Sequence, residues 1–208
     1  MMLEKLIVFV EEYSMEAVLE AILPSMLGEI DFQIIRFQCK ADLLKHLPIR
    51  LKGYSWIPDS WSILVLIDRD DSDCKVLKDQ LEQHAISSGF VTRTSAKTGQ
   101  RFRVTNRIVI EELEAWYFGD WNAVKTAYPK VPATIPQKSS FRDPDAITGG
   151  TWEAFERVLK RAGYFSTGLR KIECARDIAQ YMNIHQNKSC SFKMFFKAVQ
   201  SILAGSVA

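Results

Sequence analysis

Two aspartates at the end of an apolar run are the residues best suited to chemistry. Residues 62–67 (SILVLI) form a short, almost continuous apolar run typical of a central parallel strand, and Asp68 and Asp70 follow it. In an extended chain these two side chains project to the same side, roughly 6 to 7 Å apart along the strand. Hard cations such as Mg²⁺ take oxygen ligands and keep several waters, so one or two carboxylates are enough. We therefore interpret the pair as metal ligands.

A polar turn that only caps the next helix is the alternative interpretation. We accept it for Asp73, whose side chain is placed to cap the helix expected after it. It does not explain Asp68 and Asp70, because two carboxylates at the mouth of an apolar strand need a counter-ion or a raised pKa. A purely structural role for the pair stays open.

The elements that position these aspartates alternate between strand and helix. Strands are expected at 3–10, 32–37 and 62–67, and helices from Ser14, over 40–47 and over 73–87, with Pro24 kinking or ending the first helix and Pro48 ending the second. This alternation predicts an α/β fold with a mostly parallel sheet flanked by helices. Glu11 ends the first strand, so we expect it at the same sheet edge as Asp68.

Three more carboxylates follow further along the chain, in the stretch 111–121 (EELEAWYFGDW). Glu111, Glu112 and Glu114 precede an aromatic run, and at least one of them is expected only to complement a helix dipole. Another could complete the metal site, with Glu112 the preferred candidate and Glu114 the alternative. The aromatic residues are expected in the core.

A basic arm is expected between these two acidic stretches. Residues 90–94 and 101–110 resemble two strands of a hairpin joined by a loop containing glycine. The charged residues of the arm are all basic: Arg93, Lys97, Arg101, Arg103 and Arg107. A solvated edge that discourages aggregation and a nucleic-acid contact through Arg101, Arg103 and Arg107 explain the pattern equally well.

The composition changes after residue 128. Residues 128–150 hold four of the seven prolines without a regular period, and we expect a loop there. Amphipathic helices are expected at 151–162, where Thr151 could cap, and at 170–182 and 192–203. The sequence thus predicts an α/β domain over 1–128 and a loop with a helical extension, packed on it, over 129–208.

Bulk properties exclude several classes of protein. A net charge of +2 means that any nucleic-acid affinity must come from the arrangement of charges. The four cysteines form no CxxC pair, which argues against a structural zinc site or a disulfide framework and favours a reducing cytoplasm. No apolar run is long enough for a membrane span or an export signal.

Several motifs together indicate a family. A strand ending in Glu11, a helix opened by Ser14 and a strand ending in Asp68-Arg69-Asp70 resemble the Toprim domain of topoisomerases, primases and OLD (overcoming lysogenization defect) nucleases, over residues 1–120. Over nearly the whole chain, the sequence is similar to a prokaryotic Toprim-like family of unassigned biochemical function, found beside ATPase genes in anti-phage settings. The motifs carrying this second resemblance are VEEYSMEA, LIDRDDSDC, EELEAWYFGD, YPKVP, FRDPDA, GGTWEAF, KIECARDIA and NKSCSF.

The resemblance implies phosphoryl transfer on a nucleic-acid backbone. Glu11 would act near the scissile phosphate as acid or base, while Glu11, Asp68, Asp70 and Glu112 would hold one or two Mg²⁺ or Mn²⁺ ions. Lys171 would stabilise developing charge. In many Toprim proteins glycine follows the glutamate, whereas this chain has Glu12 there.

The expected function is therefore a metal-dependent nuclease acting on DNA or RNA. We expect an effector subunit of an anti-phage system that an ATPase partner controls, and the aromatic stretch 116–121 or the extension 151–203 is expected to contact that partner. Two alternatives stay open. One is a non-catalytic adaptor that binds metal only for structure, and the other is a hydrolase of small phosphate esters.

Overall fold

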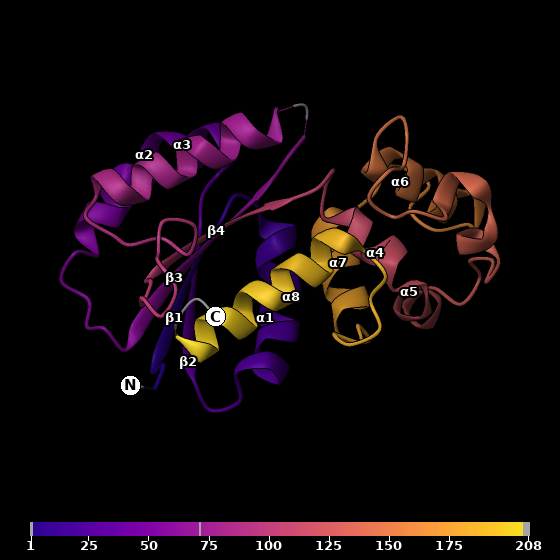
Figure 1. Cartoon of the computed structure of the whole chain (residues 1–208). Helices are drawn as coiled ribbons and strands as arrows, with labels where there is room; N and C mark the ends of the chain where they lie inside the picture. The colour runs from indigo at the N-terminus through magenta and orange to yellow at the C-terminus, as the bar shows by residue number, and fades with distance from the viewer. Residues whose placement is uncertain (1, 71, 206–208) are drawn as a thin grey trace. The chain divides into compact units, whose positions relative to one another are not determined.

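The structure is a computed structural model, and it describes residues 2–70 and 72–205. Figure 1 shows the elements, which in chain order are β1 (Lys5–Val10), α1 (Tyr13–Leu27), β2 (Asp31–Arg36), α2 (Lys40–Gly53), β3 (Trp61–Asp68), α3 (Cys74–Ser87), β4 (Val104–Val109), α4 (Glu114–Gly119), α5 (Trp121–Ala127), the 3₁₀ turns η1 (Ile135–Gln137) and η2 (Ser139–Phe141), α6 (Thr151–Arg161), α7 (Lys171–Ala179) and α8 (Cys190–Ala204). Within the described ranges, no helix has the length and apolar character needed to cross a membrane.

The chain divides into two compact units. The first consists of Met1–Glu12, Pro24–Ile108 and Phe195–Ala208, and the second of Tyr13–Leu23 and Val109–Met194. This division differs from the boundary after residue 128 that the change in composition suggests. A change in composition can only mark a boundary between consecutive segments. The two units are not consecutive segments, because α1 and α8 each contribute residues to both.

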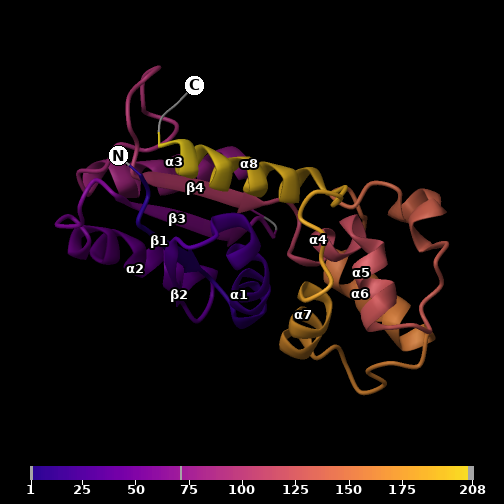
Figure 2. The same cartoon turned by 90° about the horizontal axis from the view of Figure 1, so that it is seen from below.

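The first unit is built on a four-stranded sheet with the order β2-β1-β3-β4, which Figure 2 shows across the sheet. β1 pairs in parallel with both β2 and β3, and Val10 lies opposite Leu66. All residues from Leu6 to Val10 and from Ile63 to Ile67 are buried, so the central strands are covered on both faces, as their apolar sequences predict. The predicted α/β fold with a mostly parallel sheet flanked by helices is confirmed.

Helices α2 and α3 cover one face of this sheet (Figure 1). Leu43, Leu47 and Leu51 of α2 are fully buried in the core of the unit. The prediction that Pro48 ends this helix is wrong, because α2 continues to Gly53. A proline inside a helix costs about 3 kcal/mol, and a fully buried leucine contributes roughly 1.5 to 3 kcal/mol. The burial of Leu51 beyond Pro48 therefore offsets much of the cost of the proline.

The predicted hairpin arm is also wrong. Thr92 forms a single parallel bridge with Val104, and residues 90–94 make no strand. Thr92 and Ser95 form reciprocal hydrogen bonds, in which Ser95 Oγ accepts from the Thr92 amide and Thr92 Oγ1 from the Ser95 amide, both at 3.0 Å. This turn directs the chain away from the sheet before a second strand can form.

Helix starts differ from the sequence prediction at two of three caps. Asp73 does cap α3, accepting from the amides of Lys75 and Val76 at 2.8 and 3.0 Å. Ser14 and Thr151 lie inside α1 and α6, whose N-cap residues have no side-chain cap bond. Helix α1 also continues past Pro24 to Leu27. A hydroxyl residue one or two positions from a helix start is a weak marker, since boundaries shift with tertiary contacts.

The second unit has an aromatic core. Trp116, Tyr117 and Phe118 of α4 are at most 2% exposed, and Trp121 is 7% exposed. Phe155 of α6 contacts three of these rings, at centroid distances of 5.3 Å to Tyr117, 5.6 Å to Phe118 and 6.5 Å to Trp121. The core role expected for these aromatic residues is therefore found. The suggestion that residues 116–121 contact a partner does not fit, because these rings are already buried.

Two of the motifs that carry the family resemblance supply structural hydrogen bonds in this unit. Asp145, from FRDPDA, accepts from Ser189 Oγ at 2.8 Å and from the amides of Cys190 and Ser191 at the start of α8. Asn187, from NKSCSF, donates to the Trp116 carbonyl at 2.9 Å. These bonds satisfy free amides at a helix start and a buried carbonyl, which explains the residue types without a catalytic role.

Candidate metal centre

Three carboxylates meet where β1 and β3 end. Glu11 follows β1, Asp68 is the last residue of β3 and Asp70 lies two residues beyond it. One oxygen from each of Glu11, Asp68 and Asp70 lies within 4.8 Å of the other two. Because β1 and β3 are parallel neighbours in register, their carboxyl ends open on the same edge, and this convergence is the one that the sequence pattern predicts.

Glu11 is held in an environment that disfavours its charge. The residue is 7% exposed, its Oε1 accepts a long hydrogen bond of 3.3 Å from the Asp68 amide, and its Oε2 has no hydrogen-bond partner among the described residues. Burial, followed by the negative charges of Asp70 and Glu12, raises the pKa of Glu11 from 4.5 to about 7. Near neutral pH and without a cation, this carboxyl group is therefore only partly ionised.

Lys40 is the functional candidate that the sequence analysis missed. Its Nζ donates to the carbonyl oxygens of Asp68 and Arg69 at 2.8 and 2.6 Å and contacts Asp70 Oδ2 at 3.2 Å. This ammonium holds the turn after β3 in place. Its positive charge also lowers the pKa of Glu11, but by less than burial and the charges of Asp70 and Glu12 raise it. Lys40 begins α2, after β2, so only the three-dimensional arrangement reveals its reach to the end of β3.

The backbone of Asp70 turns the chain back toward the cluster. Asp70 has a φ of 45°, a left-handed conformation that aspartate and asparagine tolerate better than most residues. Its side chain is 47% exposed, in contrast to the buried Glu11 and Asp68. The centre therefore has two fixed carboxylates and one that solvent can reach.

These residues fit a hard divalent cation. Around Mg²⁺, with ligand distances of about 2.1 Å, neighbouring oxygens lie about 3.0 Å apart and opposite ones about 4.2 Å apart. The three oxygens lie within 4.8 Å of one another, and half-exposed Asp70 is the carboxylate best able to move closer to an ion. The partnerless Oε2 of Glu11 supplies a buried acceptor, and carboxylate oxygens are the donors that Mg²⁺ and Mn²⁺ prefer.

Glu112 belongs to the second unit and caps a helix there. Its Oε2 accepts from the amides of Thr151 and Trp152 at 3.1 and 2.9 Å, at the start of α6. A carboxylate in this position satisfies two free amides and complements the helix dipole. Sequence reasoning expected this role for one of the three glutamates but assigned Glu112 to the metal.

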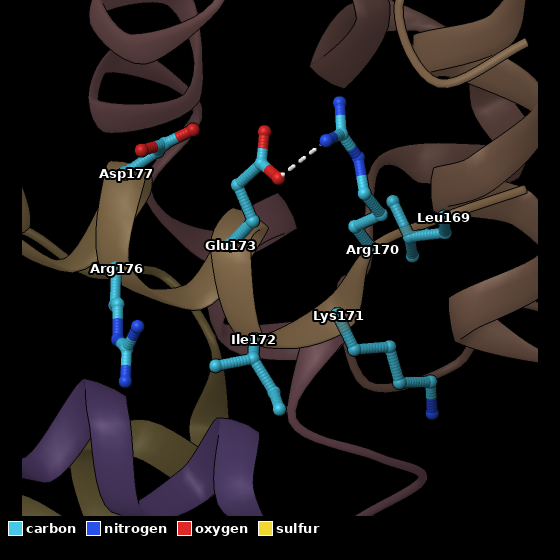
Figure 3. A pocket seen from close by; sticks show the side chains of 7 residues that line it. All are labelled: Leu169, Arg170, Lys171, Ile172, Glu173, Arg176 and Asp177. Carbon is cyan, nitrogen blue, oxygen red and sulfur yellow. Dashed lines mark ion pairs between the residues drawn. The ribbon is translucent and has the colours of Figure 1, made fainter.

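Lys171 also belongs to the second unit. Its Nζ lies 4.0 Å from Oε1 of Glu114, which is buried, and 5.2 Å from the centroid of the Trp152 ring. Figure 3 shows the surface hollow around α7, in which the Lys171 side chain points away from Glu173. Glu173 pairs with Arg170 at 2.9 Å. Lys171 thus has a local partner in the second unit, whereas Lys40 contacts the acidic cluster through Asp70.

Of the three arginines predicted to bind nucleic acid, Arg103 is engaged within the first unit. Arg103 lies by the start of β3, where it contacts the Ile57 carbonyl, Asp59 Oδ1 at 3.4 Å and the face of Phe90. It therefore lies at the opposite end of β3 from Asp68, a separation of about 20 Å along the strand. Arg101 is exposed just before β4, and Arg107 lies within β4.

Comparisons with known proteins place the chain in context. The model of the family described as "Domain of unknown function (DUF4276)" matches residues 10–200. No curated protein matches. Among solved structures, the chain is similar to the C-terminal region of the Xanthomonas campestris pv. campestris OLD protein (12% identity, 96% of this chain and 95% of that chain, TM-score 0.49) and to that of the Burkholderia pseudomallei OLD protein (13% identity, 95% and 98%, TM-score 0.45).

Proposed function

The chain belongs to the DUF4276 family, whose function is unknown, and we propose that it is a metal-dependent nuclease that hydrolyses phosphodiester bonds of DNA or RNA. The observation that carries this proposal is the convergence of Glu11, Asp68 and Asp70 at the carboxyl edge of the parallel sheet. Paired acidic groups at such an edge are suited to bind the divalent cations that phosphoryl-transfer enzymes use.

Each residue of the centre has a distinct task in this proposal. Asp68 and Asp70 would hold Mg²⁺ or Mn²⁺. When bound, such an ion polarises the phosphate and stabilises the attacking and leaving oxygens. Glu11 would contact the ion with one carboxylate oxygen and accept a proton from the attacking water with the other. Lys40 holds the turn that carries Asp70, so that the carboxylates stay in position.

The test is cleavage by the purified protein of supercoiled plasmid, single-stranded DNA and single-stranded RNA, with Mn²⁺, with Mg²⁺ and with EDTA. We expect cleavage with metal only, and loss of at least 100-fold in Asp68→Ala/Asp70→Ala, because both ion ligands are removed. Asp79→Ala, an exposed aspartate on α3, is the matched control and should cleave normally.

Three results would overturn the proposal. Cleavage that persists unchanged in Asp68→Ala/Asp70→Ala would show that the centre is not responsible. Turnover of small phosphate monoesters without any action on polymers would indicate a small-molecule phosphohydrolase. A protein that binds Mn²⁺, as followed by calorimetry, but cleaves no substrate even beside its partner would be a metal-binding adaptor.

We also propose that the nuclease is a cytoplasmic effector of an anti-phage system, controlled by an ATPase partner. The first support is that the sequence motifs resemble a family found beside ATPase genes. The second is that an unselective nuclease would damage its own cell, so its activity must be controlled by another protein. With residues 116–121 buried, exposed apolar residues of the second unit are the better contact candidates: Ile172 and Tyr181, which are 38% and 47% exposed. Co-purification with the neighbouring ATPase, and its loss in Tyr181→Glu, tests this, with Ile49→Glu, at an exposed apolar residue of the first unit, as the control.

A further inference from the structure

Two arginines, Arg93 and Arg107, lie beside or within β4. The segment Val91–Arg93 lies along this strand: the Arg103 amide donates to the Val91 carbonyl at 2.9 Å, and the Arg93 amide donates to the Val104 carbonyl at 2.8 Å. Thr92 and Val104 form a parallel bridge and therefore share a face. Arg93 begins the turn that follows Thr92, and its amide bond to Val104 holds it beside β4, in which Arg107 lies three residues further on.

Neither arginine is paired with a carboxylate. Among residues 2–70 and 72–205, neither Arg93 nor Arg107 forms an ion pair, and both Nε atoms are buried without a hydrogen-bond partner. The nearby carboxylate, Glu82, accepts from Lys78 Nζ at 2.7 Å and from Asn106 Nδ2 at 2.9 Å on Oε1, while its Oε2 has no hydrogen-bond partner among the described residues. Lys78, Arg93 and Arg107 therefore carry three positive charges against the one negative charge of Glu82.

The charges of this group act on one another. Burial, and then the charge of Arg93, lower the pKa of Arg107, and burial followed by the charges of both arginines lowers the pKa of Lys78 despite its bond to Glu82. Both guanidinium groups are partly buried, so solvent screens their repulsion less than it would at an open surface. Such an arrangement is stabilised by an anion that bridges the two groups.

We propose that Arg93 and Arg107, with Lys78 beside them, bind a phosphate of a nucleic-acid strand. A guanidinium presents two parallel N–H donors that match two oxygens of a phosphate. A lysine ammonium is a point charge without this geometry, and a chloride ion offers no pair of oxygens to accept both bonds. This inference rests on the proposed function for the kind of ligand, and it replaces the set Arg101, Arg103 and Arg107 that the sequence pattern suggests. Arg103 already contacts Ile57, Asp59 and Phe90 within the first unit.

The test is equilibrium binding without cleavage. Fluorescence anisotropy of labelled 20-nucleotide single-stranded DNA and RNA is measured in EDTA over a range of salt concentrations, for the wild-type protein and Arg93→Gln/Arg107→Gln. Each phosphate contact contributes about 0.7 to the slope of log K against log salt, so we expect the slope to fall by roughly 1.4 and the affinity at 0.1 M salt to fall about tenfold or more. Arg50→Gln/Arg101→Gln removes the same charge from exposed sites of the same unit and should retain near wild-type affinity.

A second variant separates charge from geometry. Arg93→Lys/Arg107→Lys keeps both charges but removes the forks, so we expect the wild-type salt slope with several-fold weaker binding. Thermal unfolding of each variant confirms that it is folded. Wild-type affinity and slope in Arg93→Gln/Arg107→Gln, an equal loss in the control, or no binding by the wild-type protein would each overturn the inference. Competition by polyglutamate as strong as that by nucleic acid would indicate an acidic protein partner and would also overturn it, as would saturation by millimolar inorganic phosphate without any binding of the polymer.

The inference and the proposed function can fail separately. Binding that depends on Arg93 and Arg107, together with no cleavage under any metal condition, would keep the phosphate site and remove the nuclease assignment. Metal-dependent cleavage of long substrates at the wild-type kcat/KM in Arg93→Gln/Arg107→Gln would keep the nuclease and remove the phosphate site.

Discussion

Replacement of Glu11 by glutamine should stabilise the metal-free protein. Glutamine has nearly the same shape, and its amide oxygen can still accept from the Asp68 amide, but it carries no charge to repel Asp70. The folded protein raises the pKa of Glu11 from 4.5 to about 7, so between these values the folded state binds more protons than the unfolded state does. Stability contributed by this group is therefore present at low pH and is lost as the pH rises through that window.

The magnitude follows from the size of the shift. One pKa unit corresponds to about 1.4 kcal/mol, so an ionised Glu11 costs the folded state roughly 3 kcal/mol above pH 7. Glu11→Gln should then gain roughly 3 kcal/mol in the free energy of unfolding at pH 8 and close to nothing at pH 4.5. The side chain is 7% exposed, so solvent screening reduces this figure little.

Urea unfolding followed by circular dichroism, in EDTA at pH 4.5, 6 and 8, measures the effect. A divalent cation at 100 times its Kd would stabilise the wild-type protein by about 2.7 kcal/mol, and Glu11→Gln should lose most of that gain. Glu20→Gln, an exposed glutamate on α1, is the control and should change stability by less than about 0.5 kcal/mol at every pH. A Glu11→Gln protein that is less stable than wild type at pH 8, or equally stabilised at all three pH values, would refute the reasoning.

Three further predictions concern polar side chains whose hydrogen bonds hold neighbouring segments together: Lys40, Glu112 and Tyr128. Lys40→Met should lower the metal-free free energy of unfolding by roughly 2 kcal/mol, because two carbonyl oxygens and Asp70 lose a charged donor; no change in urea midpoint would contradict this. Glu112→Ala should cost about 1 kcal/mol in the same assay, with cleavage activity retained if Glu112 serves only as a helix cap, whereas full loss of cleavage would return it to the metal site. Tyr128→Phe should cost about 1 kcal/mol through the lost bond to Asp177. In the wild-type protein burial raises the pKa of the Tyr128 phenol, so an alkaline ultraviolet titration of the variant should lack one late-titrating phenol.

The sequence predicts those strands and helices whose formation depends on the local pattern of apolar residues. Three strands followed by helices are readable because each apolar run or helical face carries its own periodicity, and parallel strands then bring Glu11 and Asp68 to one edge. Glu82 shows the limit of this approach. It is a buried carboxylate on a helix: the spacing of Lys78 and Glu82 on one helix is readable from the sequence, but only the folded chain supplies Asn106.

The residues that sequence reasoning misplaced depend on contacts between distant segments. Lys40 reaches the end of β3 from the start of α2, and Glu112 finds two amides some forty residues further along the chain. No spacing rule predicts either contact, because both partners are backbone groups that carry no sequence signal. The hairpin prediction fails for a related reason, since the Thr92 and Ser95 hydroxyls compete with strand pairing for the same amides.

The shared use of α1 and α8 has a consequence for synthesis on the ribosome. The first unit needs residues from 195 onward, but residues 109–194, which belong to the second unit, are made before them. At about 5 to 20 residues per second, this interval lasts roughly 4 to 17 s, during which the sheet has been made but lacks the last segment of its own unit. Domains usually mature in order from the N-terminus, whereas here the first-made unit is completed last. A nascent chain stalled between residues 109 and 194 should therefore expose apolar surface of the sheet, and chaperones would bind it at that stage.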